Sequence, residues 1–144
     1  MVRMVLVVGV IAGCNHGAVT AIDASPASID APTPDPPGCK TDKLHFTRDT
    51  GCANDGSVEF CIPDNNSQLR SALAMIEPAI GCAPGGGRAN CSASPGLLLC
   101  TYHTSVPGQC RMADHGAMTD AAWADMCAIA AFAAITEIVP TFAE

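Results

Sequence analysis

Eight cysteines spread between residues 39 and 127 constrain the fold of this chain more than any other sequence feature. They are Cys39, Cys52, Cys61, Cys82, Cys91, Cys100, Cys110 and Cys127. An even set of cysteines predicts a disulfide framework, as is typical of exported domains, and sequence alone does not fix its connectivity. Structural zinc sites bring cysteines together about two to four residues apart, whereas here the closest neighbours have eight residues between them. The spacing therefore favours disulfides over a metal site.

Two cysteine-containing segments repeat one another at an interval of 30 residues. GCANDGSVEFC at 51–61 and GCAPGGGRANC at 81–91 share Gly, Cys, Ala, a second Gly and a final Cys. Each can form a loop that turns on its central glycine, because glycine takes positive φ without steric cost. If the repeat is structural, it predicts the local pairs Cys52–Cys61 and Cys82–Cys91. Coincidence is the alternative explanation.

The first 14 residues carry the pattern of an export signal. Arg3 gives a basic start, and residues 4–11 form an apolar run of eight, shorter than the roughly 20 residues of a membrane-spanning helix. The following Ile-Ala-Gly-Cys, ending at Cys14, resembles the lipobox of bacterial lipoproteins. That resemblance implies a signal peptide over residues 1–13 and lipidation of Cys14. It also implies a lipid anchor in the outer or plasma membrane, with the protein facing the periplasm or the exterior. An ordinary signal peptide or a buried strand would be the alternatives.

Residues 15–38 have the composition of a spacer. They read NHGAVTAIDASPASIDAPTPDPPG, with five prolines and three aspartates. Such a segment buries too little apolar surface to offset the entropy lost on ordering. We therefore expect residues 14–38 to form a lipidated, disordered tether and residues 39–144 to form one cysteine-rich globular domain. That domain has six Lys and Arg against eleven Asp and Glu, a net charge of −5, which argues against nucleic-acid binding.

The hydrophobic pattern of the domain predicts an α+β fold with a short antiparallel sheet and two helices. Residues 57–62 alternate apolar and polar, and residues 97–104 form a second strand signal. Residues 109–112 are expected to pair with that second strand after a Pro-Gly turn. Residues 44–47 are a candidate edge strand.

Capping residues mark both predicted helices. Asn66 or Ser67 caps a first helix, whose apolar residues recur at helical spacing before a proline at position 78. Thr119 caps a second, with one apolar face expected to run from Trp123 to Ile138. Part of this second helix is apolar on all sides, so we expect it to be buried.

Histidines with nearby carboxylates are the first candidates for chemistry. The set is His45, His103, His115, Asp55, Glu59 and Asp114. Imidazole and carboxylate together suit zinc binding and general base catalysis. The histidines have no H-x-x-x-H or H-E-x-x-H spacing, so separate surface histidines are the favoured interpretation.

A glycine-rich stretch offers a second candidate site. Residues 84–88, Pro-Gly-Gly-Gly-Arg, could form an anion-binding nest with Arg88 beside it. The stretch lacks the Gly-Lys-Ser/Thr ending of a P-loop, and a flexible turn is the favoured alternative. Ser92 and Ser94 do not lie in a G-x-S-x-G elbow.

Three classes of function follow from these patterns. The favoured one is a non-enzymatic binding or structural module of the cell envelope. It needs no cofactor, and its partners are the membrane, through the lipid anchor, and a protein or glycan. The first alternative is a small secreted hydrolase or metalloenzyme that uses His103 or His115 with a carboxylate. The second is a protease inhibitor that presents a disulfide-closed loop carrying Arg88, which a rigid and exposed loop would favour because pre-ordering lowers the cost of binding.

Overall fold

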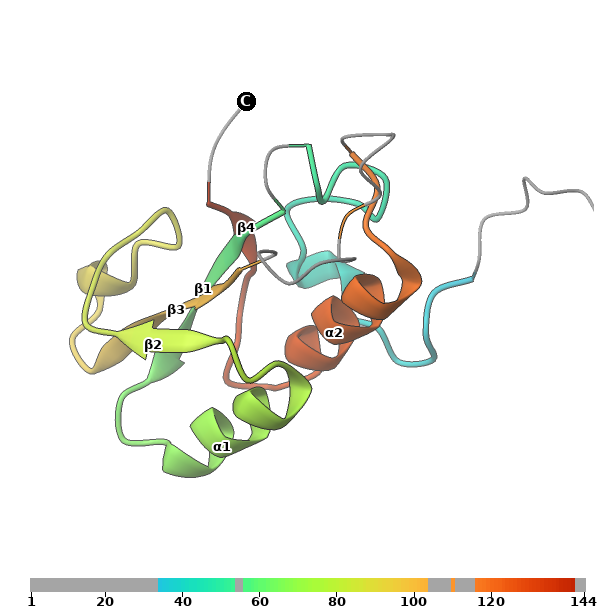
Figure 1. The fold of residues 1–144 in the computed structure, drawn as a ribbon. Coiled ribbons are helices and arrows are strands. Elements are labelled where there is room, and N and C mark those ends of the chain that lie inside the picture. Colours follow the sequence, from blue (N-terminus) through green and yellow to red (C-terminus); the bar gives the residue numbers. More distant parts are fainter. Residues whose placement is uncertain (1–33, 54–55, 104–109, 111–115, 142–144) are drawn as a thin grey trace, which may run out of the picture. The chain divides into compact units, whose positions relative to one another are not determined.

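A four-stranded antiparallel sheet and two α-helices form the centre of the fold (Figure 1). The structure is a computed structural model, and it describes residues 34–53, 56–103, 110 and 116–141. Within these residues, four disulfides cross-link the secondary structure. The predicted α+β class and the predicted disulfide framework are both confirmed. Cys14 and most of the predicted tether lie outside the described residues.

The sheet has the strand order β2-β3-β1-β4. β1 (Val58–Pro63) is central and pairs with β3 (Leu97–Tyr102) on one side and β4 (Val139–Pro140) on the other. β2 (Gly81–Ala83) pairs with the outer edge of β3. β1 and β3 correspond to the two strands expected from the sequence, whereas β2 and β4 were not expected.

The structure differs from the sequence-based expectation at two predicted strands, residues 109–112 and 44–47. The partners of β3 are β1 and β2, not residues 109–112, of which only Cys110 is described and forms an isolated bridge with Met118. At 44–47 no edge strand forms, and Leu44 makes a single parallel bridge to Ile138. Long-range pairing with β1 and β2 thus replaces the expected hairpin of β3, and a single long-range bridge replaces the expected edge strand at 44–47.

Both helices begin at the capping residues that the sequence indicates. α1 (Ser67–Ile76) is capped by Asn66, whose side-chain oxygen accepts a hydrogen bond from the Leu69 amide at 2.9 Å. α2 (Asp120–Ala130) is capped in the same way by Thr119, which accepts from the Ala122 amide at 3.3 Å. Each bond satisfies an amide that has no partner within the helix.

The second helix is shorter than predicted, because it ends at Ala130 instead of continuing to Ile138. The Ile138 amide donates to the Lys43 carbonyl at 2.8 Å, and the His45 amide donates to the Ile138 carbonyl at 3.0 Å. Lys43 Nζ also donates to the Phe132 carbonyl at 2.8 Å. These long-range bonds hold residues 131–138 away from a helical path, and the β-branched residues near their end suit an extended chain.

The two faces of the sheet are covered differently. Val58, Phe60 and Ile62 of β1 are fully buried in the larger core, together with residues of both helices. The opposite face carries Glu59 and Cys61, and residues 84–96 cover it instead. This second layer includes a short 3-10 helix, η2 (Cys91–Ala93).

The disulfide pairing differs from the local pairs that the internal repeat suggested. The bonds are Cys39–Cys127, Cys52–Cys110, Cys61–Cys91 and Cys82–Cys100. The pairing Cys52–Cys61 and Cys82–Cys91 is therefore wrong. Antiparallel register places Cys82 directly opposite Cys100 on neighbouring strands, so cross-strand proximity, not closeness in sequence, selects that partner. Among the glycines of the second repeat, the positive φ occurs at Gly87 (54°), not at its central Gly86.

Candidate functional site

Residues 84–96, which we call the arginine loop, form a small lobe over the face of the sheet that carries Glu59. Ala89 and Cys91 of the loop are buried, and with Val139 they form a hydrophobic cluster separate from the main core. Cys61, Leu97 and Leu99 of the sheet pack against this cluster. The cluster is small, so apolar burial alone contributes little to holding the loop in place.

A buried carboxylate holds the centre of the arginine loop. Glu59 is only 7% exposed, and its Oε2 accepts a hydrogen bond from the Arg88 amide at 2.6 Å. Gly87, with φ of 54°, lies so close that a Cβ at this position would collide with the same carboxylate. The residues expected to bind an external anion thus surround an anion of the chain itself. The alternation of β1 placed Glu59 on the polar side of the strand but gave no sign that a loop would cover it.

Further bonds define the loop as a tight turn. The Asn90 amide donates to the Gly87 carbonyl at 3.4 Å, and the Cys91 amide donates to the Gly86 carbonyl at 2.8 Å. Asn90 has a left-handed backbone with φ of 53°, which asparagine tolerates better than most residues. The Cys82–Cys100 disulfide closes the whole loop, and Cys61–Cys91 ties it to β1. Arg88 therefore projects from a turn with covalent support on both sides.

The Arg88 side chain is exposed and has no hydrogen-bond or ion-pair partner among the described residues. The other arginines that the structure describes are engaged, since Arg48 pairs with Asp120 and Arg70 donates to the Asp64 carbonyl. Arg88 is also the only charged residue of the arginine loop. Asn90, Ser92 and Ser94 of the same loop are also exposed. The loop thus presents one available cation among small polar groups.

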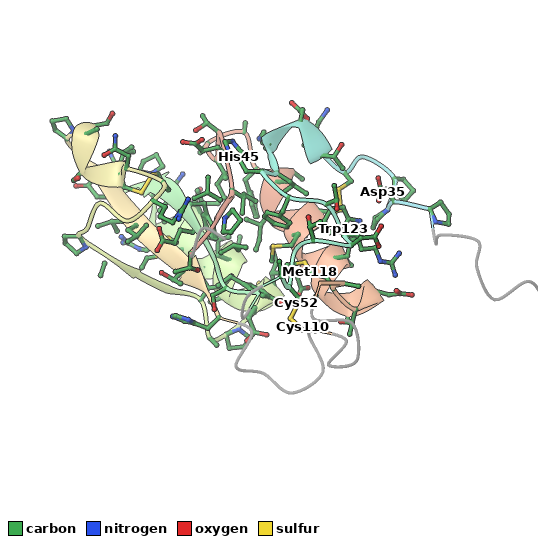
Figure 2. All side chains as sticks on the ribbon, turned by 90° about the horizontal axis from the view of Figure 1, so that it is seen from above. Asp35, His45, Cys52, Cys110, Met118 and Trp123 are labelled. Carbon is green, nitrogen blue, oxygen red and sulfur yellow. A yellow bond between two sulfur atoms is a disulfide. The ribbon has the colours of Figure 1, made fainter. Side chains whose placement is uncertain are left out.

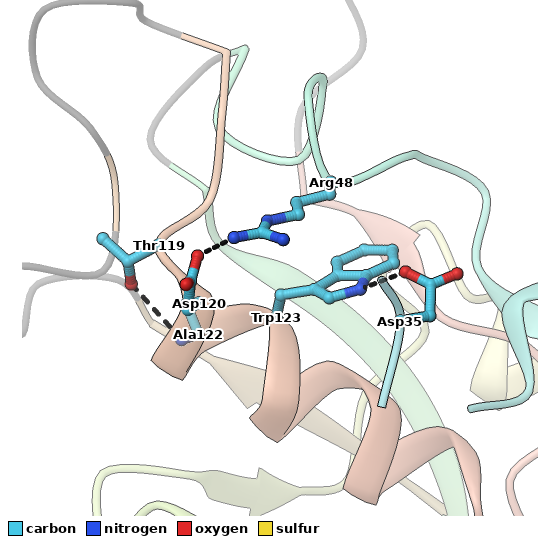
Figure 3. A network of polar contacts seen from close by, with 6 residues as sticks. All are labelled: Asp35, Arg48, Thr119, Asp120, Ala122 and Trp123. Carbon is cyan, nitrogen blue, oxygen red and sulfur yellow. Dashed lines mark hydrogen bonds and ion pairs between the residues drawn. The ribbon is translucent and has the colours of Figure 1, made fainter. Parts of the chain in front are cut away.

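The chain enters the domain at the end opposite the arginine loop, where Asp35 contacts Trp123. Trp123 Nε1 donates to Asp35 Oδ1 at 2.8 Å, and Arg48 pairs with Asp120 beside it (Figure 3). Phe46 packs edge-on against the Trp123 ring, with 6.3 Å between the ring centroids. Asp35 and Trp123 lie at one end in the view of Figure 2, and the arginine loop, in yellow, lies at the other. Figure 1 shows the same separation of the entering chain from η2.

The candidate histidines do not form a site among the described residues. His45 pairs with Glu137 at 3.3 Å on the surface, with the two side chains 54% and 42% exposed. His103 is exposed just after β3, while Glu59 holds the Arg88 amide. No group of three His, Cys, Asp or Glu residues within the described part of the chain is arranged to hold a metal ion. The remaining candidates lie outside the described residues: His115, Asp55 and Asp114.

One titratable pair, fully buried Tyr102 and half-buried Asp125, lies between β3 and α2. The Tyr102 hydroxyl donates to Asp125 Oδ2 at 3.1 Å, and Tyr102 is fully buried. Burial raises the pKa of Tyr102, and the neighbouring Asp125 carboxylate raises it further. The pKa of Asp125 is also raised, first by burial and then by the charge of Glu77, although the bond from Tyr102 opposes the shift. A hydroxyl without solvent access cannot meet a substrate, so this pair links the sheet to α2.

A shallow groove of about 380 Å³ is the other surface feature. It lies between the start of α1 and the chain after α2, and it is lined by Asn66, Gln68, Leu69, Ala72, Phe132, Ala133 and Ala134. The groove contains no charged or nucleophilic group, so it offers apolar contact but no chemistry.

Comparison with known proteins gives no match: no protein-family model, no curated protein and no solved structure resembles the chain. In addition, no helix found in residues 34–141, as far as these are described, is long and apolar enough to cross a membrane. The arginine loop therefore has to be interpreted from its own geometry.

Proposed function

We propose that the chain is a membrane-tethered, exported binding module of the cell envelope. The observation that carries this proposal is the arginine loop, in which two disulfides and a buried carboxylate support one exposed cation that has no partner within the described part of the chain. These links hold the loop in one conformation, and a loop held in one conformation loses less freedom when it binds a partner. Support of this kind is expected where a loop must keep its shape in order to bind.

The disulfides indicate the compartment. All eight cysteines of the cysteine-rich domain are paired, and disulfides form and persist in oxidising environments such as the periplasm or the cell exterior. The proposal also includes a lipid anchor at Cys14, which is supported by the lipobox resemblance of the first 14 residues. Two acyl chains on one cysteine would make attachment stable, whereas one chain gives only reversible binding.

An enzyme is the weaker alternative on the described residues. His45 is paired with Glu137 on an exposed surface, and His103 has no hydrogen-bond or ion-pair partner among the residues that the structure describes. General base catalysis requires a base held within hydrogen-bond reach of a reacting group, usually oriented by a third group. The arginine loop, in contrast, is fixed by two disulfides and by the hydrogen bond from the Arg88 amide to Glu59.

Membrane attachment is tested by replacing Cys14 with Ser in the full chain. The variant is expected to move from the membrane fraction to the soluble fraction while its thermal unfolding stays unchanged. A matched Ser92→Ala variant, altered at an exposed loop serine, should remain with the membranes. Persistence of the Cys14→Ser variant in the membrane fraction would contradict the anchor.

A further inference from the structure

We propose that Arg88 is the central contact of a protein-binding surface formed by the arginine loop, and that its partner is a protein presenting a carboxylate in a recess. The inference rests on the proposed binding function and names the site and the chemistry of its partner. The guanidinium of arginine matches a carboxylate with two parallel hydrogen bonds, which makes it the usual choice for such contacts.

Pre-ordering of the loop is the first supporting observation. The Arg88 amide is bound by Glu59 Oε2 at 2.6 Å, and the neighbouring Cys91 is bonded to Cys61. Binding normally costs free energy for ordering the loops and side chains of an interface. Here the backbone part of that cost falls on folding instead, so an Arg88 contact would contribute more of its energy to affinity.

The composition around Arg88 is the second. Gly, Ser and Asn supply adaptable hydrogen bonding in binding loops, and arginine is enriched at the energetic centres of interfaces. Arg88 directly follows three glycines in the sequence, and the same loop carries exposed Asn90, Ser92 and Ser94. Small residues near an arginine leave a partner free to close around the guanidinium.

The charge of the domain selects a single carboxylate over a polyanion. The cysteine-rich domain has a net charge of −5, and Arg88 is the only charged residue in its loop. A sulfated glycan or an anionic membrane would be repelled by the rest of the surface, because long-range fields act on the whole ligand. A recessed carboxylate on an otherwise neutral protein surface would meet only Arg88.

The conformation of the loop argues against insertion into a protease as a substrate. Substrate-like inhibitors offer an extended backbone to the enzyme, whereas Arg88 lies in the turn closed by the Asn90 amide and the Gly87 carbonyl. Its own amide is already bound to Glu59. The loop is rigid and exposed, which favours the inhibitor hypothesis. Its turn conformation, however, favours contact through the Arg88 side chain over contact through an extended backbone.

The position of the loop is consistent with presentation to a partner. The arginine loop lies at the end of the domain opposite the residues where the chain enters at Asp35 (Figures 1 and 2). The contact surface that we propose therefore does not overlap the residues at which the chain enters the domain.

Selection from displayed random dodecapeptides on the immobilised full chain tests the inference. We expect the selected peptides to contain Asp or Glu and to lose affinity by about 30-fold or more for Arg88→Gln. Arg88→Lys should recover only part of this loss, because lysine keeps the charge but not the two-pronged geometry. Lys40→Gln, which removes an exposed cation near the entering chain, is the matched control and should change affinity less than about twofold.

The possible outcomes distinguish a failure of the proposed Arg88 site from a failure of the proposed binding function. Peptides that bind wild type and Arg88→Gln equally would overturn the Arg88 site and leave the binding function standing. Failure to select any peptide would count against both. Inhibition of trypsin by the wild type, lost in Arg88→Gln, would replace the inference with protease inhibition. Peptides without a carboxylate would overturn the proposed partner chemistry.

Discussion

The two ends of this domain are stabilised by different physical means. At the α2 end, Trp123, Met126 and Ile129 belong to a large buried core that joins both helices to the sheet. At the arginine loop, only Ala89, Cys91 and Val139 form the buried cluster, and two disulfides and the Glu59 hydrogen bond accompany it. The first end therefore combines a large packed core with the Cys39–Cys127 disulfide, whereas the second end has little packing and relies on covalent and polar links. The variants below test this difference, from the largest expected effect to the smallest.

Trp123→Ala should produce the largest loss, about 3–5 kcal/mol in the free energy of unfolding, because it leaves a cavity in the core. Urea unfolding measures the change. Arg88→Gln, at the other end, is expected to stay within about 0.5 kcal/mol of the wild type, since it is an exposed substitution. Equal losses in the two variants would refute the distinction between the ends.

Replacing both Cys61 and Cys91 with Ser should lower the free energy of unfolding by about 2–4 kcal/mol. The same change should expose the Arg88–Ala89 peptide bond to trypsin under native conditions, which mass spectrometry of the digest would reveal. The matched control replaces Cys39 and Cys127, whose bond lies at the α2 end. If both double variants were cut after Arg88 at the same rate, the loop would not depend on its local bridge.

Glu59→Ala should cost about 1–3 kcal/mol, because it leaves the Arg88 amide without its acceptor. Hydrogen exchange at the Arg88 amide should accelerate about tenfold or more, since 1.4 kcal/mol corresponds to a factor of ten. Glu59→Gln keeps an acceptor oxygen and should show a smaller effect on both measurements. An unchanged Arg88 exchange rate in Glu59→Ala would show that the Glu59 carboxylate does not hold the arginine loop in place.

The smallest effect concerns Asp125 and depends on pH. Its native pKa is raised above the ordinary value of 3.8, so the native state holds a proton more strongly than the unfolded state. Stability should therefore decrease as the pH rises from 3.8 through the native pKa. Asp125→Asn retains an acceptor for the Tyr102 hydroxyl and should lose this decrease. Parallel slopes of unfolding free energy against pH in the two proteins would contradict the assignment.

Local sequence signals predicted the elements that local interactions form. The alternation around Phe60 identified β1, and the caps Asn66 and Thr119 identified the starts of both helices. The end of α2 escaped prediction, because the backbone bonds of Ile138 to Lys43 and His45 connect distant parts of the chain. Short β2, with the sequence Gly-Cys-Ala, carries no strand preference of its own and depends on its pairing with β3.

The arginine loop shows the same limit more sharply. Its glycines and Arg88 were recognisable as a candidate anion site, yet the anion proved to be Glu59, 29 residues earlier in the chain. Likewise, the repeat of Gly and Cys motifs suggested neighbouring partners for Cys61 and Cys82, whereas strand register and the second layer supplied distant ones. The sequence identified the glycines, Arg88 and the cysteines as candidate residues, but the contacts between them depend on how distant parts of the chain fold together.

The Cys39–Cys127 bond has a topological consequence for the fate of a damaged molecule. It closes a covalent ring across a sequence separation of 88 residues. A single break in the backbone anywhere between these two cysteines opens the ring without dividing the molecule, so both new ends stay linked to the N-terminal segment. Only a second break, at a place not bridged by another disulfide, would release a fragment. A protein exposed to extracellular proteolysis would in this way survive its first nick as one covalent unit.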